Sequence, residues 1–174
     1  MKSSLKINHT LRPFCPFAKK ELDQDRVRFA LSEVIEFEAG LEALIQECER
    51  LDDNDQIETT LIIYSNLLTD FEDFLDFIEM ANQLLSMQGY EGVYQLASFH
   101  PDYCFEGEDE NDAANYTNRS PWPMLHLIRE VSMGKILESY PEPELIPENN
   151  INLARKKGPD YFESILTKIK KDEN

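Results

Sequence analysis

Two histidines and one cysteine are the residues of this chain whose side chains are best equipped for proton transfer or nucleophilic attack. His100 and His126 carry imidazole rings, which gain and lose protons near neutral pH. Cys15 precedes a proline and lies close to Lys19 and Lys20, and nearby positive charge stabilises the nucleophilic thiolate. The residue types therefore indicate His100, His126 and Cys15 as candidate catalytic residues.

A second group of polar residues has the chemistry of an anion-binding site. The segment that ends in Arg119 and Ser120 precedes a predicted helix, whose first-turn amides and positive dipole end favour a carboxylate or phosphate. A guanidinium adds a bidentate donor for the same groups. The candidate ligand-binding residues are Tyr103, Asn115, Asn118, Arg119, Ser120 and Arg129.

Each of these residues also has a plain structural interpretation. A histidine can be buried and hydrogen-bonded in a core, and Arg119 can pair with one of the many acidic side chains. His100, Asp102 and His126, with Cys15, are instead candidate ligands for a divalent metal, although they do not follow a recognised metal-binding spacing. No cofactor is assigned from the residues.

The hydrophobic pattern predicts three strands, each followed by a helix. The strands are expected at residues 27–31, 59–64 and 93–99, and the helices follow Ser32, Thr69 and Ser120. The third helix is expected to reach about Ser139 and to place His126 and Arg129 on one face. This order favours an α/β fold with a small, mainly parallel sheet of three or four strands, covered by helices.

The chain is expected to form a single domain over residues 1–174. Residues 1–26 are predicted to be an irregular arm because Pro13 and Pro16 discourage a helix. Residues 27–139 form the predicted α/β core, and residues 140–174 a proline-rich connection and a helical C-terminal extension. Ligands in open parallel sheets bind at the carboxyl ends of the strands, where most of the candidate polar residues would meet.

Composition and charge narrow the function classes. The formal net charge is −17, which repels phosphate backbones and anionic lipids, so neither nucleic acid nor membrane is an expected partner. No apolar run approaches the roughly 20 residues that span a bilayer, and the N-terminus lacks the hydrophobic region of a signal peptide. Three cysteines without CxxC spacing do not form a disulfide scaffold. We therefore expect a cytoplasmic protein.

Several segments resemble a bacterial family of uncharacterised proteins, domain of unknown function 1415. Trp122 departs from its pattern, because it stands where a tyrosine is expected between two prolines. The resemblance covers roughly residues 10 to 158 and implies no mechanism. The segments that carry it are Cys15-Pro16-Phe17-Ala18, Val27-Arg28-Phe29, Glu58-Thr59-Thr60-Leu61, Gln95-Leu96-Ala97-Ser98-Phe99-His100-Pro101-Asp102-Tyr103, Asn115-Tyr116-Thr117-Asn118-Arg119-Ser120-Pro121, Leu125-His126-Leu127-Ile128-Arg129-Glu130 and Ile146-Pro147-Glu148.

Three hypotheses about function follow, and they leave open whether the protein is an enzyme and what its oligomeric state is. In the first, a pocket at the strand carboxyl ends binds or acts on an anionic small molecule. In the second, Cys15, His100 and His126 form a metal- or thiol-dependent active site. In the third, an acidic, non-enzymatic interaction protein docks a basic partner through its negative surface, which includes residues 106–112.

Overall fold

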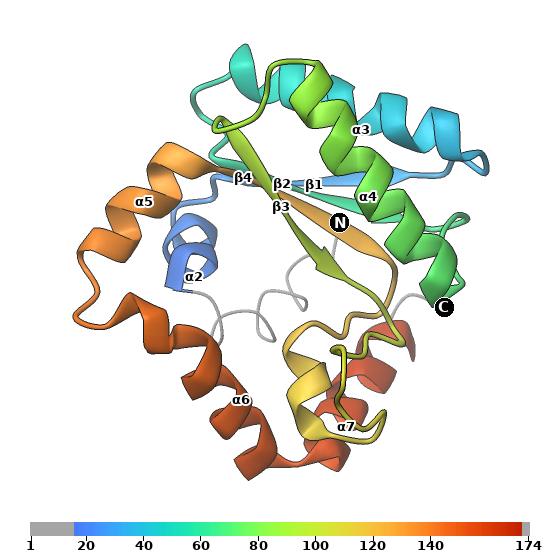
Figure 1. The fold of residues 1–174 in the computed structure, drawn as a ribbon, viewed down its shortest axis with the longest axis vertical. Helices are drawn as coiled ribbons and strands as arrows, with labels where there is room; N and C mark the ends of the chain where they lie inside the picture. The colour runs from blue at the N-terminus through green and yellow to red at the C-terminus, as the bar shows by residue number, and fades with distance from the viewer. Residues whose placement is uncertain (1–15, 172–174) are drawn as a thin grey trace.

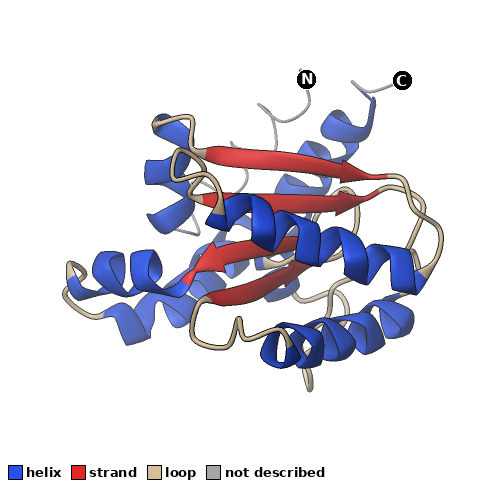
Figure 2. Ribbon diagram, turned by 90° about the horizontal axis from the view of Figure 1, so that it is seen from above, coloured by secondary structure: helices blue, strands red, loops and turns tan. Residues whose placement is uncertain are grey.

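Four strands form one sheet in the order β1-β2-β4-β3, and helices pack on both of its faces (Figures 1 and 2). The computed structural model describes residues 16–171, with side chains from residue 20 onward. The elements are α2 (Pro16–Asp23), β1 (Val27–Ser32), α3 (Phe37–Asp52), β2 (Thr59–Tyr64), α4 (Phe71–Met87), β3 (Tyr94–Phe99), the 3-10 helix η1 (Ala113–Thr117), β4 (Met124–Arg129), α5 (Glu130–Glu138), the 3-10 helix η2 (Pro143–Leu145), α6 (Ile146–Lys157) and α7 (Pro159–Lys171).

Strand pairing shows a mixed sheet, so the prediction of a mainly parallel one is wrong. β1 pairs parallel with β2, whereas β4 lies between β2 and β3 and runs antiparallel to both. The three strands predicted from the sequence are all present. Because β4 opposes both of its neighbours, β1, β2 and β3 still run in the same direction, and their carboxyl ends lie at one edge of the sheet.

The fourth strand occupies a segment for which a helix was expected. β4 lies between β2 and β3, with residues 124–128 buried and Arg129 half-buried, and the helix α5 begins only at Glu130. A strand buried on both faces has apolar residues at nearly every position, which hides the alternation typical of strands. Pro123 starts no helix. Its carbonyl oxygen accepts the Tyr64 N–H at 3.0 Å and so extends the pairing with β2.

The N-terminal prediction is also partly wrong. The expected irregular arm over residues 1–26 contains the helix α2, which begins at Pro16. A proline is tolerated in the first turn of a helix because the N–H groups there have no partner inside the helix. Residues 1–15, including Cys15, lie outside the described part of the chain.

The sheet separates two apolar cores. On one face, α3 and α4 bury their apolar sides against residues such as Ile62 and Leu127. On the other face, Leu61 and Met124 pack with Ile169 of α7. The predicted helical C-terminal extension is confirmed, since α6 and α7 pack against η1 around Phe162. No described helix combines the length and the apolar character needed to cross a bilayer.

Gly40 lies where α3 packs tightly against Leu67 and Phe77. A Cβ atom there would lie 2.9 Å from Leu67 Cδ2 and 3.0 Å from Phe77 Cε2. Gly40→Ala is therefore expected to destabilise the protein by about 1–3 kcal/mol through overpacking, partly offset by a gain of up to about 1 kcal/mol in helix propensity.

The matched control is Gly134→Ala in α5, where a Cβ atom has no neighbour within 4 Å. This substitution is expected to stabilise the protein by up to about 1 kcal/mol. Urea unfolding of the two variants measures the difference, and a Gly40→Ala variant as stable as Gly134→Ala would contradict the close packing of α3.

Candidate functional site

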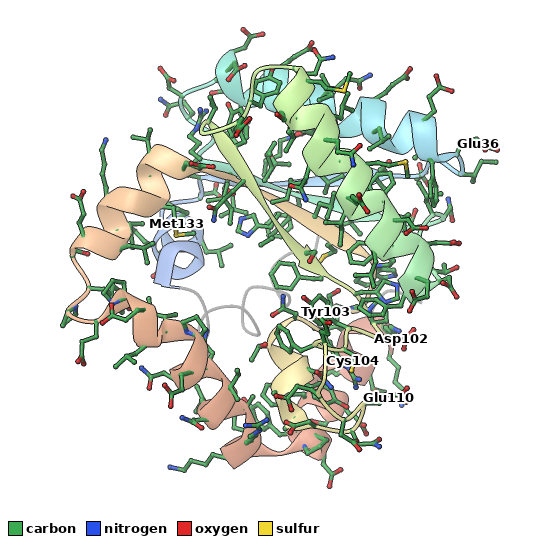
Figure 3. All side chains as sticks on the ribbon, in the orientation of Figure 1. Glu36, Asp102, Tyr103, Cys104, Glu110 and Met133 are labelled. Carbon is green, nitrogen blue, oxygen red and sulfur yellow. The ribbon has the colours of Figure 1, made fainter. Side chains whose placement is uncertain are left out.

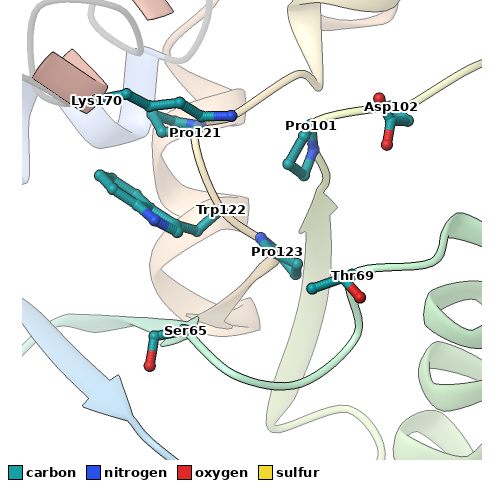
Figure 4. Close-up of a pocket in the computed structure, with 8 residues that line it drawn as sticks. All are labelled: Ser65, Thr69, Pro101, Asp102, Pro121, Trp122, Pro123 and Lys170. Carbon is teal, nitrogen blue, oxygen red and sulfur yellow. The ribbon is translucent and has the colours of Figure 1, made fainter.

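The sheet edge at the carboxyl ends of β1, β2 and β3 contains a hollow of about 550 Å³ (Figure 4). Because β4 runs the opposite way, the segment that enters it also lies at this edge. The loop after β2, the loop after β3, the entry to β4 and the end of α7 therefore all contribute walls. The lining residues are Ser65, Thr69, Pro101, Asp102, Pro121, Trp122, Pro123 and Lys170.

The lining combines an apolar wall with a few polar groups. Trp122 is half-buried and packs with Ile165 and Ile169 of α7, which leaves part of the indole facing the hollow. Figure 4 shows Trp122 and Lys170 on one side and Thr69 and Asp102 on the other. A hollow with an aromatic wall and opposed charged groups has the character of a small-molecule site.

His100 joins the two loops that wall this hollow. Its ring is fully buried, and Asp102 N–H donates to Nδ1 at 3.0 Å. A backbone N–H can only donate, so the hydrogen of the neutral ring lies on Nε2, which donates to the Leu68 carbonyl at 3.0 Å. Burial lowers the pKa of His100 below its ordinary value. The imidazole thus positions the walls of the hollow and does not line it.

The partner of this histidine has an unusual backbone. Leu68 has a φ of 65°, a left-handed conformation that costs a residue with a side chain about 1–2 kcal/mol. Strained residues of this kind gather at functional sites, where the surrounding structure holds them in place. Ser65 and Thr69, which line the hollow, flank Leu68 in the same loop. The hydrogen bond from His100 is therefore a reason why this loop keeps its shape.

His126 lies on the opposite face of the sheet from the ring of His100. His126 pairs with Leu61, which belongs to the core on the α7 side, whereas the ring of His100 packs against Phe74 of α4. Thr59 Oγ1 donates its hydrogen to the Leu127 carbonyl at 2.6 Å. The same oxygen lies 2.7 Å from His126 Nε2 and can accept a hydrogen bond from the Nε2–H group. Burial lowers the pKa of His126 to about 4.

The candidate metal ligands do not come together. His100 and His126 point to different faces of the sheet, and both ring nitrogens of His100 are engaged in hydrogen bonds. Within residues 16–171, no group of three or more His, Cys, Asp or Glu side chains could hold a metal ion. Cys15 lies outside the described residues. Of His100, Asp102 and His126, Asp102 alone lines the hollow.

Two of the predicted ligand-binding residues, Asn115 and Asn118, stabilise the long loop between β3 and β4 by hydrogen bonds to its backbone and to β3. Asn115 is fully buried; its Oδ1 accepts Phe105 N–H at 3.0 Å and its Nδ2 donates to the Asp109 carbonyl at 2.9 Å. Asn118 Nδ2 donates to the Ser98 carbonyl at 3.1 Å, which ties η1 to the end of β3. These amides satisfy backbone groups that the loop would otherwise leave unpaired.

Arg119 serves the same loop. Its Nε donates to the Tyr103 carbonyl at 3.0 Å and its Nη2 to the Glu110 carbonyl at 2.8 Å. The guanidinium lies 4.7 Å from the centre of the Tyr116 ring. Figure 3 labels Tyr103 and Glu110, which both belong to the loop between β3 and η1. Two donors expected to bind an anion are thus directed to backbone carbonyls.

The remaining predicted ligand-binding residues lie elsewhere or make local contacts. Arg129 ends β4, at the far edge of the sheet from Arg119, where its guanidinium donates to the Leu51 carbonyl and to Tyr94 Oη. Ser120 Oγ donates to the Trp122 carbonyl at 2.5 Å and shapes the entry to β4. The ring of Tyr103 packs edge-on against Phe71 and Phe105. The two arginines therefore do not converge on one ligand.

The acidic loop is attached to a C-terminal helix. Arg155 of α6 bonds Asp112 at 3.0 Å and Glu108 at 3.1 Å. Asp112 also caps η1 by accepting Ala114 N–H at 2.7 Å. The Arg155 guanidinium holds the pKa of Asp112 below its usual value. Part of the negative charge predicted to face a partner is thus used within the fold.

Two lining residues, Trp122 and Lys170, were not singled out as ligand-binding from the sequence. Trp122 is the only tryptophan of the chain, lies between two prolines and departs from the pattern that the resemblance implies. These features could have identified Trp122 as a candidate ligand-binding residue. No local pattern marks Lys170, which reaches the hollow only because α7 packs beneath the sheet edge.

Sequence comparison places the chain in a family. Residues 10–164 match the model of a family described as a protein of unknown function (DUF1415), and the chain belongs to this family. The match confirms the resemblance found in the sequence. Neither the curated proteins nor the solved structures contain a match.

Proposed function

We propose that this protein binds a small molecule with a single anionic group in the hollow at the carboxyl edge of the sheet. The proposal rests on the residue types that line this hollow. Trp122 and three prolines offer an apolar surface, and Lys170 and Asp102 stand on opposite sides of it. A ligand with a flat or apolar body, an anionic end at Lys170 and a hydrogen-bond donor at Asp102 fits this arrangement.

The charge of the site and of the whole chain favours a monoanion over a polyphosphate. Among the described residues of the lining, Lys170 is the one cation and Asp102 the one anion, so these two charges balance. The chain as a whole carries a formal net charge of −17, which repels a multiply charged ligand most strongly. A small carboxylate is the ligand class that these two facts support.

The experiment is a thermal-shift screen of small carboxylates, followed by calorimetric titration of each stabilising compound. Lys170→Gln is expected to weaken binding of a true ligand roughly fivefold, since one solvent-exposed ion pair is lost. Lys171→Gln makes the same change of charge one residue further along α7, at a side chain that does not line the hollow, and is expected to leave the affinity within about twofold.

A ligand that binds both lysine variants with equal affinity would exclude Lys170 as the anion-binding group. A screen in which small carboxylates bind no better than their neutral amides would contradict the proposed ligand class. Arg119→Ala serves as a second comparison, because Arg119 holds the loop between β3 and β4 and does not line the hollow. This variant is expected to have a lower thermal stability even in the absence of ligand.

A further inference from the structure

The outer surface of the α3–α4 layer contains a second hollow, far along the chain from the residues of the first. This groove has a volume of about 700 Å³ and is lined by residues of both helices, which contact each other and pack on the same core. Figure 1 shows the two helices together in one layer, at an oblique angle to each other. Its floor is apolar and includes Phe37, Leu41 and Ile45 of α3 and Met80 and Leu84 of α4. Met80 is 36% exposed, although it is a large apolar side chain.

Three glutamates line the same groove. Glu38, Glu42 and Glu49 are exposed and recur on α3 at intervals of four and seven residues, which places them on one side of the helix. Among the described residues, no basic side chain pairs with any of them; Arg50 of the same helix pairs with Glu47 instead. The groove therefore combines an apolar floor with a row of uncompensated negative charge.

We propose that this groove is a docking site for a basic amphipathic helix of a partner protein. An amphipathic helix buries its apolar stripe in such a groove, with anchors spaced at three and four residues. Lysines or arginines beside that stripe would meet Glu38, Glu42 and Glu49. The charge of the whole layer adds to this, because α3 has five acidic residues and one arginine, and α4 has four acidic residues and no basic one.

Charge also distinguishes this occupant from two others. A second copy docked symmetrically through the same groove would bring two rows of glutamates together, which is unfavourable. An anionic lipid surface would be repelled by the same row. Complementary charge favours the basic helix, steers its approach and sets its register more than it sets raw affinity.

The test uses a labelled synthetic peptide of about 18 residues, with leucines at helical spacing and lysines at most other positions. Fluorescence polarisation measures its binding to the full chain. Glu38→Gln/Glu42→Gln/Glu49→Gln is expected to weaken binding by roughly tenfold or more. The control Glu138→Gln/Glu142→Gln/Glu144→Gln removes three exposed charges elsewhere and is expected to change the affinity less than about threefold.

A second variant tests the floor. Met80→Gln keeps the length of the side chain but makes it polar, and it is expected to weaken peptide binding roughly threefold or more. A peptide of the same composition in shuffled order, which has no apolar stripe, is expected to bind at least about tenfold more weakly than the helical one. Together these results would establish both the charge and the apolar contribution.

Several outcomes overturn the proposal. They are the absence of peptide binding, an equal loss of affinity in the control triple variant, and equal binding of the shuffled peptide. A dimer of the protein that Met80→Gln dissociates in sedimentation would make a second copy the occupant of the groove. Binding to phosphatidylserine vesicles that the groove variants abolish would make a lipid surface the occupant.

Discussion

Acidification from pH 7 to pH 5 is expected to cost the protein about 2 kcal/mol of unfolding free energy through His126 alone. The pKa of this side chain is lowered by burial from 6.5 to about 4. The unfolded chain therefore binds a proton at a pH where the folded protein does not. This contribution to stability is fully present above pH 6.5, and it is lost as the pH falls through the folded pKa, with about 3 kcal/mol gone by pH 4.

Urea unfolding at several pH values measures this effect, with His126→Gln as the control. The amide of glutamine does not titrate and can still donate to Thr59 Oγ1, so the variant is expected to lose less stability between pH 7 and pH 5. This window lies above the ordinary pKa of carboxylates, which limits their contribution. Curves for parent and variant that run parallel across it would contradict the buried, neutral state of His126.

His100→Phe is expected to lower the free energy of unfolding by about 3 kcal/mol and to weaken binding in the hollow as well. Phenylalanine preserves the aromatic contacts with Phe71 and Phe74. It removes both hydrogen bonds of the imidazole, and each buried partner left unsatisfied costs about 1–3 kcal/mol. The left-handed turn at Leu68 also loses its support, so the loop that walls the hollow is expected to shift.

Two polar substitutions separate the two hydrogen bonds. In His100→Asn, the side-chain oxygen can still accept Asp102 N–H, as in an Asx turn. In His100→Gln, the amide can still donate to the Leu68 carbonyl. If the histidine positions the loop at Leu68, His100→Gln retains more ligand affinity than His100→Asn. A His100→Phe variant with parental stability and parental affinity would show that His100 supports neither the fold nor the hollow.

The sequence predicted the edge of the sheet at which the hollow lies, although one strand was missed. Three strands that run in one direction gather their carboxyl ends whatever lies between them, so inserting β4 did not displace the edge. The missed strand had a second consequence. On the expected helix, His126 and Arg129 would share a face, whereas on β4 the odd spacing sends them to opposite faces.

Most of the residues predicted for the candidate site do not line the hollow, although the hollow lies at the predicted edge of the sheet. His100 was chosen for proton transfer, and Asn115 and Arg119 for binding an anionic ligand. In the structure all three side chains donate hydrogen bonds to backbone carbonyls of nearby loops. Side-chain type alone does not distinguish a ligand from an unpaired carbonyl, since both accept the same hydrogen bond. The sequence could not predict that Lys170 lines the hollow, because its position depends on how α7 packs.

Ligand binding in the hollow is tested most directly by the fluorescence of Trp122, the only tryptophan in the chain. Its indole lines the hollow, so a carboxylate identified by thermal shift is expected to change the emission saturably and to protect the ring from acrylamide quenching. The midpoint should agree with calorimetry and move to higher concentration in Lys170→Gln. A ligand that binds stoichiometrically in calorimetry while both the emission and the quenching of Trp122 stay constant would show that binding occurs somewhere else.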